Sequence, residues 1–563
     1  MKRIYFKSTL LAAMVLLATS CTKLNEEVLD ESLTTVGLTE RQIADGQLAP
    51  IYAVLPGLFL HTAYFDLQEI STDEAILPYR GGTDWGDNGI YISMHRHETT
   101  STDPNVRSTW NSITQGISRT VTAIFSLKTN TDATAPMYIA EARAMRAYYN
   151  MLSLDLFGIA FVKDDPGAVS TIIRGTEAVD YIKSELLAAE PLLGNTTGPG
   201  RLTKAGVWGL LARLHLNAPV YRDLYADAFQ FKTEDMDAVI NYCDKIISSG
   251  QYALSPDYFA IFGDNNHDNK ELVFAVDQRA DLNGHNRMAY FSLSGDQFPL
   301  PAFPAANGTD GPGITPEYYR TWVNAYAPVD PAKADPRFYK QNISIYTNPG
   351  DSCVADFNID RGILRGQQYG LIRRNTSTFE KCADGKYKVG KLFNTTRSNP
   401  NLPVEFTEFI DFSTAGSNYS TGYRVEKYEF SRKSVSGRNF GEADLSIIRL
   451  ADVYLMRAEA KLRKNDAAGA LADVNLVRMS RTAYTVKPSP LNAISLDLLF
   501  RERGFEFYWE MIRRTDMIRL GKYEGAWTEK TSTDKQKRIF PIPQAAIDGA
   551  SNLPDYLVQN KGY

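Results

Sequence analysis

Three glutamates at helical spacing, Glu502, Glu506 and Glu510, could carry acid–base chemistry. Glycoside hydrolysis needs two carboxyl groups about 5–10 Å apart across a cleft, one of them with a raised pKa. These glutamates instead alternate with arginines, and side chains three or four residues apart on a helix pair with one another. Because such pairing lowers the pKa of a carboxyl group, the pattern favours a structural ion-pair network over catalysis. The arginines concerned are Arg501, Arg503, Arg513 and Arg514.

A metal site is the second chemistry that residue types suggest. His95 and His97 could ligate a metal from a strand, but no third ligand is apparent beside them, which favours a loop or strand role. No phosphate-binding glycine loop, dinucleotide fingerprint or nucleophile elbow occurs in a fitting context. The sequence therefore predicts no catalytic residue, no metal ligand and no cofactor, and it leaves a structural calcium ion undecided.

Non-covalent binding is indicated by Trp85, which lies in the polar, glycine-rich segment 81–89. Sugars present flat apolar faces and hydroxyl-rich edges, so their sites combine exposed aromatic rings with polar side chains. An exposed tryptophan is uncommon without a use, and Asp73 and Arg80 are available as polar partners. The alternatives are that Trp85 folds back to anchor the loop and that Asp73 and Arg80 form a loop-stabilising pair.

Helices must position these residues. Apolar side chains recur at helical spacing along most of the chain outside the middle block, and Gly158 is well placed to stop a helix. Short connections between helices of this length favour stacked antiparallel pairs, as in helical-repeat proteins. We therefore expect a mainly α, TPR-like scaffold over about 36–250 and 444–537. The predicted helices are 106–127, 135–157, 176–193, 202–221, 235–249, 446–462, 467–479 and 493–512.

The middle block, about 251–443, loses the helical pattern and accumulates glycine, proline, asparagine and aromatic residues. It contains short β-like runs such as 271–276, so the second half is expected to be loop-rich and partly β. Binding surfaces often lie on loops held by a rigid scaffold, which makes this block the expected ligand-binding elaboration. Cys353 and Cys382 lie here and could pair in an oxidising compartment, whereas Cys243 is expected to be a buried small side chain. A non-helical tail is predicted over 538–563.

Composition excludes one broad class of function. The 563 residues carry a formal net charge of -5, and 44% are hydrophobic. A general nucleic-acid binder would need a basic face, so this is a globular chain of another class. Its length exceeds the usual size of one hydrophobic core.

The N-terminus has the features of an export signal. Lys2 and Arg3 precede an apolar run over 10–18, which is too short to span a bilayer, and small residues lead to Cys21. This pattern predicts a lipoprotein signal peptide over 1–20, lipidation at Cys21 and a polar tether over 21–35. Several acyl chains on one cysteine give stable membrane anchoring. A plain cleaved signal peptide is the alternative.

Segments along nearly the whole chain resemble, in order, the motifs of the SusD/RagB family. The resemblance implies a single SusD-like domain over 36–563, on a lipoprotein at the cell surface of a Bacteroidetes-type outer membrane. Such a protein captures oligosaccharides without cleaving them and delivers them to a SusC-like TonB-dependent transporter. The matching segments are 71–85, 141–149, 157–158, 448–460, 475–478, 502–521, 541–543 and 559–563.

The resemblance also implies where the ligand binds. Family members build an aromatic arc from the early loop and the middle block, which would join Trp85 to Tyr290, Phe298, Phe303 and Trp322. Part of this set is core in the other interpretation, because Trp322 shares helical spacing with neighbouring tyrosines and prolines flank the two phenylalanines. Two alternative functions stay open: a RagB-like lipoprotein that captures peptides, and a secreted glycoside hydrolase.

Overall fold

The computed structural model describes residues 37–80, 89–195, 198–279, 281, 286–298, 300–301, 308–342, 352–355, 357–412, 419–434 and 441–563. The predicted signal peptide, Cys21 and the tether lie outside these residues, as do Trp85 and Phe303. Within the described ranges, no helix is long and apolar enough to cross a membrane.

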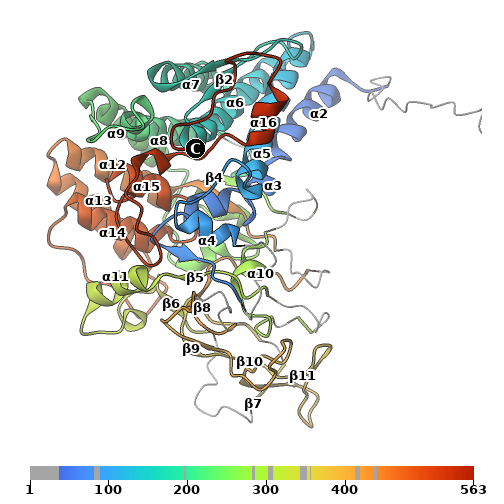
Figure 1. Cartoon of the computed structure of the whole chain (residues 1–563), viewed down its shortest axis with the longest axis vertical. Helices are drawn as coiled ribbons and strands as arrows, with labels where there is room; N and C mark the ends of the chain where they lie inside the picture. Colours follow the sequence, from blue (N-terminus) through green and yellow to red (C-terminus); the bar gives the residue numbers. More distant parts are fainter. Residues whose placement is uncertain are drawn as a thin grey trace, which may run out of the picture.

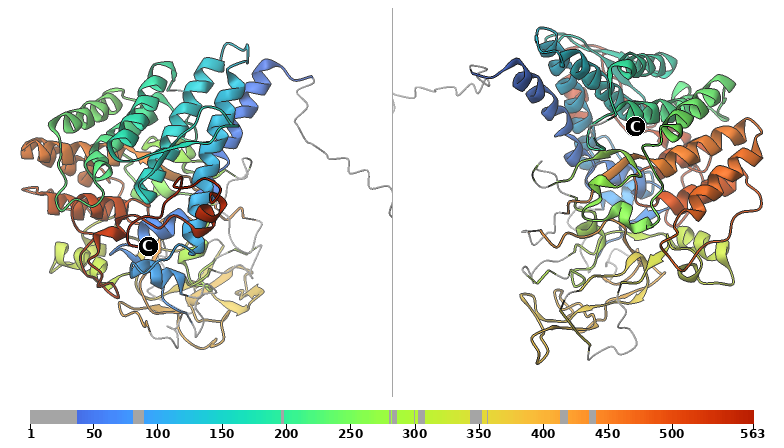
Figure 2. Two further views of the ribbon diagram at one scale, coloured as in Figure 1. Left: turned by 45° about the horizontal axis from the view of Figure 1, so that its top comes forward. Right: turned by 180° about the vertical axis from the view of Figure 1, so that it is seen from behind.

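Long helices form one continuous stack (Figure 1). Successive helices from α5 to α9 pack on one another, and α12 packs on both α9 and α13, so the C-terminal pair extends the N-terminal stack (Figure 2). This confirms the expected mainly α scaffold. The stack consists of α2 (Glu40–Tyr52), α5 (Pro104–Leu127), α6 (Ala135–Phe157), α7 (Gly175–Ala189), α8 (Lys204–Arg222), α9 (Thr233–Ser248), α12 (Leu450–Arg463) and α13 (Ala467–Met479).

Local signals set the ends of these helices. Asp103 caps α5 by accepting from the backbone N–H groups of Asn105 and Val106. Gly158 ends α6 with a φ of 70°, a left-handed conformation that glycine adopts without strain. The predicted helix stop is therefore confirmed. Four buried alanines of α6 let its neighbours approach closely; they are Ala140, Ala142, Ala144 and Ala147.

Two predicted C-terminal helices are shorter than expected. Residues 446–449 of the helix expected over 446–462 belong instead to strand β16 (Leu445–Arg449), which pairs antiparallel with β4 (Leu272–Val276) before α12 begins. The helix expected over 493–512 is shortened to α14 (Leu496–Phe507), and α15 (Arg513–Arg519) begins only after it. Positive φ angles at Trp509 and Met511 interrupt it, because backbone turns of this kind cannot continue a right-handed helix.

The middle block forms small antiparallel sheets at the end of the molecule away from the helical stack (Figure 1). Cys353 and Cys382 form a disulfide there, and Cys243 is buried in the scaffold. The strands of this part are β5 (Gly313–Ile314), β6 (Tyr339–Lys340), β7 (Ser352–Val354), β8 (Arg361–Leu364), β9 (Gly366–Gln367), β10 (Tyr369–Leu371), β11 (Arg373–Asn375), β12 (Thr378–Phe379), β13 (Tyr387–Lys391), β14 (Glu405–Phe406) and β15 (Arg424–Glu426). Strand β1 (Ala75–Ile76) comes from the early segment.

Short helices and one hairpin complete the fold. The hairpin β2 (Ala160–Val162) and β3 (Thr171–Ile173) links α6 to α7, and β1 pairs with β5 to join the early segment to the middle block. The predicted non-helical tail contains one short helix, α16. The short helices are α3 (Leu55–Leu58), α4 (Ile90–His95), α10 (Met288–Ser292), α11 (Pro316–Tyr326) and α16 (Gln544–Gly549).

Candidate functional site

Arg80 joins the early segment to the middle block. Its buried guanidinium donates to three backbone carbonyls: Nε to Asp310 O at 2.9 Å, Nη2 to Gly311 O at 2.9 Å and Nη1 to Thr421 O at 2.5 Å. Residues more than 200 positions apart thus meet at one side chain. Arg80, the residue that precedes the early loop, thus acts as a clamp on the middle block.

Asp73 and Arg80 do not form the pair that was considered from the sequence. The two carboxylate oxygens of Asp73 accept from Nε and Nη2 of Arg513, each at 2.8 Å. This bidentate contact ties the early segment to the start of α15. Both residues therefore have structural partners in the described conformation.

A cation and an aromatic ring lie beside the Arg80 clamp. Arg397 donates from Nε to Asp310 Oδ2 at 2.8 Å and from Nη2 to Gly308 O at 2.9 Å, and its guanidinium carbon is 5.0 Å from the centre of the Tyr419 ring. Arg397 and Tyr419 are half-buried, while Asp310 is fully buried. Sequence reasoning missed this trio because nothing in its local pattern links three residues so far apart in the chain.

Tyr290 belongs to the same region. Its backbone carbonyl accepts from the N–H of Thr309 at 2.9 Å, and the guanidinium of Arg287 lies 4.7 Å from the centre of its ring. The side chain is half-buried, so part of its surface can contact a ligand. Tyr290 is thus the predicted aromatic that the structure places near the clamp.

Trp322 and Phe298 lie in the core, contrary to the expected binding role. Trp322 is 0% exposed and stacks on Phe505 with ring centres 3.7 Å apart. Phe298 is 1% exposed and packs near Phe430. A ring without an exposed face cannot stack on a sugar. The helical spacing of Trp322 with Tyr318 and Tyr319 was the signal that favoured this outcome.

The glutamates of α14 and the following turn are structural, as predicted. Burial alone would raise the pKa of Glu506, but Arg481, Arg449 and Arg337 hold it well below its usual range. Of the expected arginines, Arg501 contacts Glu502 at 3.2 Å, but the other partners come from other elements rather than from the same helix. Contacts of this network join Glu502 to Arg337 and Arg478, Glu506 to Arg337, Arg449 and Arg481, and Glu510 to Lys427 and Arg449.

The two histidines also have structural roles. Nδ1 of His95 lies 2.9 Å from Ile70 O and its Nε2 lies 2.8 Å from Thr528 O, while Nε2 of His97 lies 2.8 Å from Ser71 O. Both rings are buried against backbone carbonyls, and neither shares a metal site with the other.

One further group of side chains has the composition of a cation site. His267, Asp277 and Asp444 lie close enough together to hold an ion. In this structure, however, His267 Nδ1 is 2.8 Å from Asp444 Oδ2, and Arg279 pairs with Asp277 at 2.7 Å. The three side chains therefore already have protein partners.

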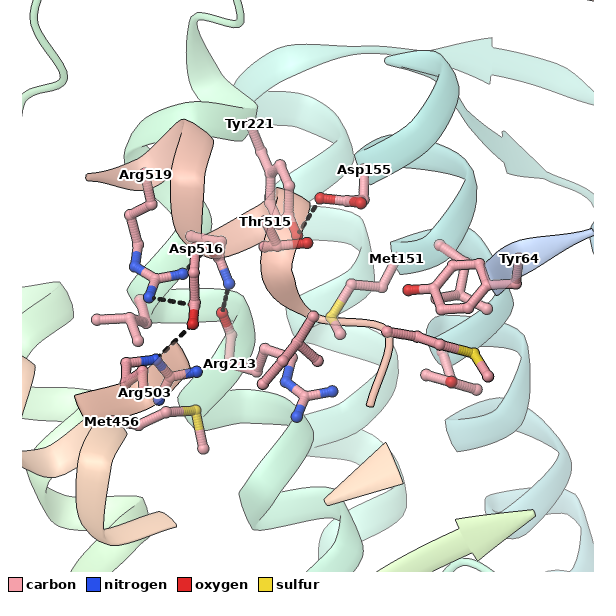
Figure 3. A pocket seen from close by; sticks show the side chains of 16 residues that line it. Tyr64, Met151, Asp155, Arg213, Tyr221, Met456, Arg503, Thr515, Asp516 and Arg519 are labelled. Carbon is pink, nitrogen blue, oxygen red and sulfur yellow. Dashed lines mark hydrogen bonds and ion pairs between the residues drawn. The ribbon is translucent and has the colours of Figure 1, made fainter. Parts of the chain in front are cut away.

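An interior cavity between α6, α8 and α15 is too small for a sugar. Its volume is about 30 Å³, room for a water molecule or two. Figure 3 shows charged side chains pairing around it: Asp516 accepts from Arg503 at 2.6 Å and from Arg519 at 2.7 Å. Tyr221 donates to Asp155 at 3.2 Å on the opposite wall. This cavity belongs to the scaffold rather than to a ligand site.

Comparison with known proteins agrees with these features. A sequence model described as "SusD family" matches residues 302–563. The starch-binding protein SusD of Bacteroides thetaiotaomicron is 26% identical over 454 residues, covering 77% of this chain and 74% of that protein. A SusD-like protein of Bacteroides ovatus is 23% identical over 544 residues, covering 92% of this chain and 84% of that protein.

Solved structures share the fold. Surface glycan-binding protein A from Bacteroides thetaiotaomicron, in complex with laminarihexaose, superposes with a TM-score of 0.63 at 19% identity, covering 92% of this chain and 99% of that one. A SusD superfamily protein from Parabacteroides distasonis gives a TM-score of 0.65 at 18% identity, covering 93% and 100%. The mainly helical scaffold with a loop-rich, partly β second half is thus the SusD-like fold, and residues 302–563 match the SusD family.

The match to this family also bears on catalysis. The SusD family consists of non-catalytic carbohydrate-binding proteins, so the prediction that the chain is not an enzyme is confirmed. The buried, arginine-bound state of Glu506 agrees with that conclusion, because a carboxyl group with a lowered pKa is a poor general acid.

Proposed function

We propose that this protein captures oligosaccharides at the cell surface and delivers them, uncleaved, to a SusC-like TonB-dependent transporter. The observation that carries the proposal is the Arg80 clamp, which fixes the early segment against residues 308–311 and 421. Beside it stand a half-buried tyrosine and an arginine–tyrosine pair, which are groups suited to the apolar faces and hydroxyl edges of sugars.

Within this proposal the residues have separate roles. Tyr290 and Tyr419 supply faces for stacking, and Arg397 donates hydrogen bonds to hydroxyl groups. Arg80 is a positioning residue, because its three donors are directed at backbone carbonyls. Trp85 and Phe303, outside the described residues, are proposed as further stacking faces. Asp73 keeps a supporting role through its bond to Arg513.

The N-terminal motif supports a proposal for the cellular location of the protein. We propose that Cys21 carries the lipid and holds the protein on the outer face of the outer membrane of a Bacteroidetes-type bacterium. Metabolic labelling with a palmitate analogue tests this: the native chain incorporates label and Cys21→Ser does not. Co-purification of a TonB-dependent transporter with the tagged, anchored protein tests the partnership, and recovery of the protein alone would contradict it.

The binding role is tested on the mature chain from Thr22 onward by calorimetry against plant, host and microbial glycans and a peptide mixture. We expect binding of at least one glycan without product release. Tyr290→Ala and Tyr419→Ala should each weaken that binding, while Phe125→Ala, an exposed phenylalanine of α5, should not. Retention of peptides alone, or released sugars, would replace the proposal with one of the two alternative functions.

A further inference from the structure

Phe409 is exposed to solvent, and hydrogen bonds hold its backbone in place. The side chain is 69% exposed, the largest exposed fraction among the bulky apolar side chains of the described residues. Its carbonyl accepts from the N–H of Gly422 at 3.1 Å and from Oγ1 of Thr407 at 3.0 Å. The next residue, Ile410, is buried and lies against Gly422. Buried Ile410 thus anchors the backbone beside the exposed ring of Phe409.

This exposed ring adjoins the proposed site. Thr407 forms a β-bridge with Thr421, whose carbonyl accepts from Arg80. A second exposed phenylalanine, Phe393 at 42%, precedes Asn394, and Nδ2 of Asn394 lies 3.5 Å from Oγ of Ser420. Isolated apolar side chains are common on protein surfaces. Two exposed phenylalanines attached to one short segment, beside an aromatic site, are a more specific pattern.

Polar groups suited to hydroxyls lie on residues that neighbour Phe409 in the chain or through the Gly422 contact. Glu408, the preceding residue, pairs with the exposed Arg320 of α11 at 2.8 Å. Half-buried Tyr423, directly after Gly422, meets Tyr319 edge to face with ring centres 4.7 Å apart. An exposed apolar ring on a segment that also carries a phenol and a carboxylate paired with a guanidinium has the chemistry of a pyranose subsite.

We propose that Phe409 forms an additional subsite that stacks on a sugar unit next to those held at the Tyr290–Tyr419 site. This inference rests on the proposed function. A short oligosaccharide occupies the main site alone, whereas a longer one also reaches Phe409. The protein therefore binds long oligosaccharides more tightly than short ones, and Phe409 sets part of that preference.

The test is calorimetry with length series of starch-derived and laminarin-derived oligosaccharides, and of any other glycan that binds in the panel. Phe409→Ala should weaken binding of the longest members about five- to tenfold, a loss typical of one aromatic contact. It should change binding of the shortest members less than twofold. Phe409→Trp, which keeps an aromatic ring at this position, should retain the preference for long oligosaccharides.

Controls separate this inference from the proposed function. Phe125→Ala, the matched exposed phenylalanine on α5, should leave all lengths unchanged, and Tyr290→Ala should weaken all lengths alike. If the native protein binds a glycan but Phe409→Ala matches it at every length, the subsite is wrong and the capture role stands. If the native protein binds no glycan, the capture role itself fails. The melting temperature of each variant is measured to establish that it is folded.

Discussion

The buried carboxyl groups of Glu69 and Glu74 bind the same turn of the chain. Each accepts from the backbone N–H of a residue with positive φ: Glu74 Oε1 from Trp509 at 2.7 Å, and Glu69 Oε1 from Met511. The pair thus holds the turn between α14 and α15. Trp509 in turn donates from its indole to Ser292 Oγ at 3.0 Å, which connects the turn to α10 and Tyr290.

The burial of these two carboxyl groups predicts how stability depends on pH. Burial raises the pKa of Glu74 to about 7 and that of Glu69 well above its usual value, against the opposing charge of Arg513. The folded state therefore holds protons that the unfolded state releases above about pH 4.5. The free energy of unfolding should fall as pH rises from about 4.5 to 7, by at most about 1.4 kcal/mol per pH unit for each proton.

Glu69→Gln isolates that contribution. The amide keeps an acceptor for Met511, so the variant should fold while its pH dependence over this range becomes shallower. Urea unfolding at several pH values provides the measurement, with Glu177→Gln, an exposed glutamate of α7, as the control. If the free energy of unfolding of Glu69→Gln depended on pH as steeply as that of the native protein, protons held by Glu69 and Glu74 would not be the cause.

Trp322 should matter for folding. Trp322→Ala removes a fully buried indole stacked on Phe505 and should lower the free energy of unfolding by about 3–5 kcal/mol. Denaturant unfolding measures this, and Trp322→Phe should cost less because most of the stacking surface remains. Normal stability combined with lost glycan binding would return Trp322 to the ligand site.

Arg80 should matter for the geometry of the site. Lysine carries all its donors on one nitrogen and cannot reproduce the three separate guanidinium nitrogens that reach these carbonyls, so Arg80→Lys should weaken glycan binding and speed amide exchange in segments 308–311 and 419–422. Hydrogen–deuterium exchange with mass spectrometry detects this, with Arg41→Lys, at an exposed arginine of α2, as the control. Equal exchange in both variants would show that Arg80 does not hold the two segments together.

The disulfide should stabilise the β-rich part. Cys353 and Cys382 are 29 residues apart, and opening a loop of this size costs about 3–4 kcal/mol in the chain-entropy account. The double alanine variant should melt at lower temperature while its helical circular dichroism is retained. A thiol assay of the native protein should find the pair unreactive before reduction, and reactive thiols at both positions would contradict the bond.

The sequence predicted the scaffold better than the site. Helices α6 and α13 have the predicted bounds because caps and periodicity act locally. The break at Trp509 and Met511 was missed, since its cause lies in Glu69 and Glu74, more than 400 residues away. The exposure of Phe409 could not be predicted, because it depends on which distant segment covers the ring, whereas the helical spacing of Trp322 already favoured its burial.

The pairing of β4 with β16 brings the two ends of the middle block together. The block leaves the scaffold after Val276 and returns at Leu445, and these two residues lie opposite each other in one antiparallel ladder. The chain therefore departs and returns at neighbouring positions of one two-stranded sheet. Outer loops between these positions can change in length without moving either end, as long as the buried contacts to α14, such as Trp322 with Phe505 and Arg337 with Glu506, are kept. New ligand preferences can thus evolve in the outer loops while the scaffold is retained.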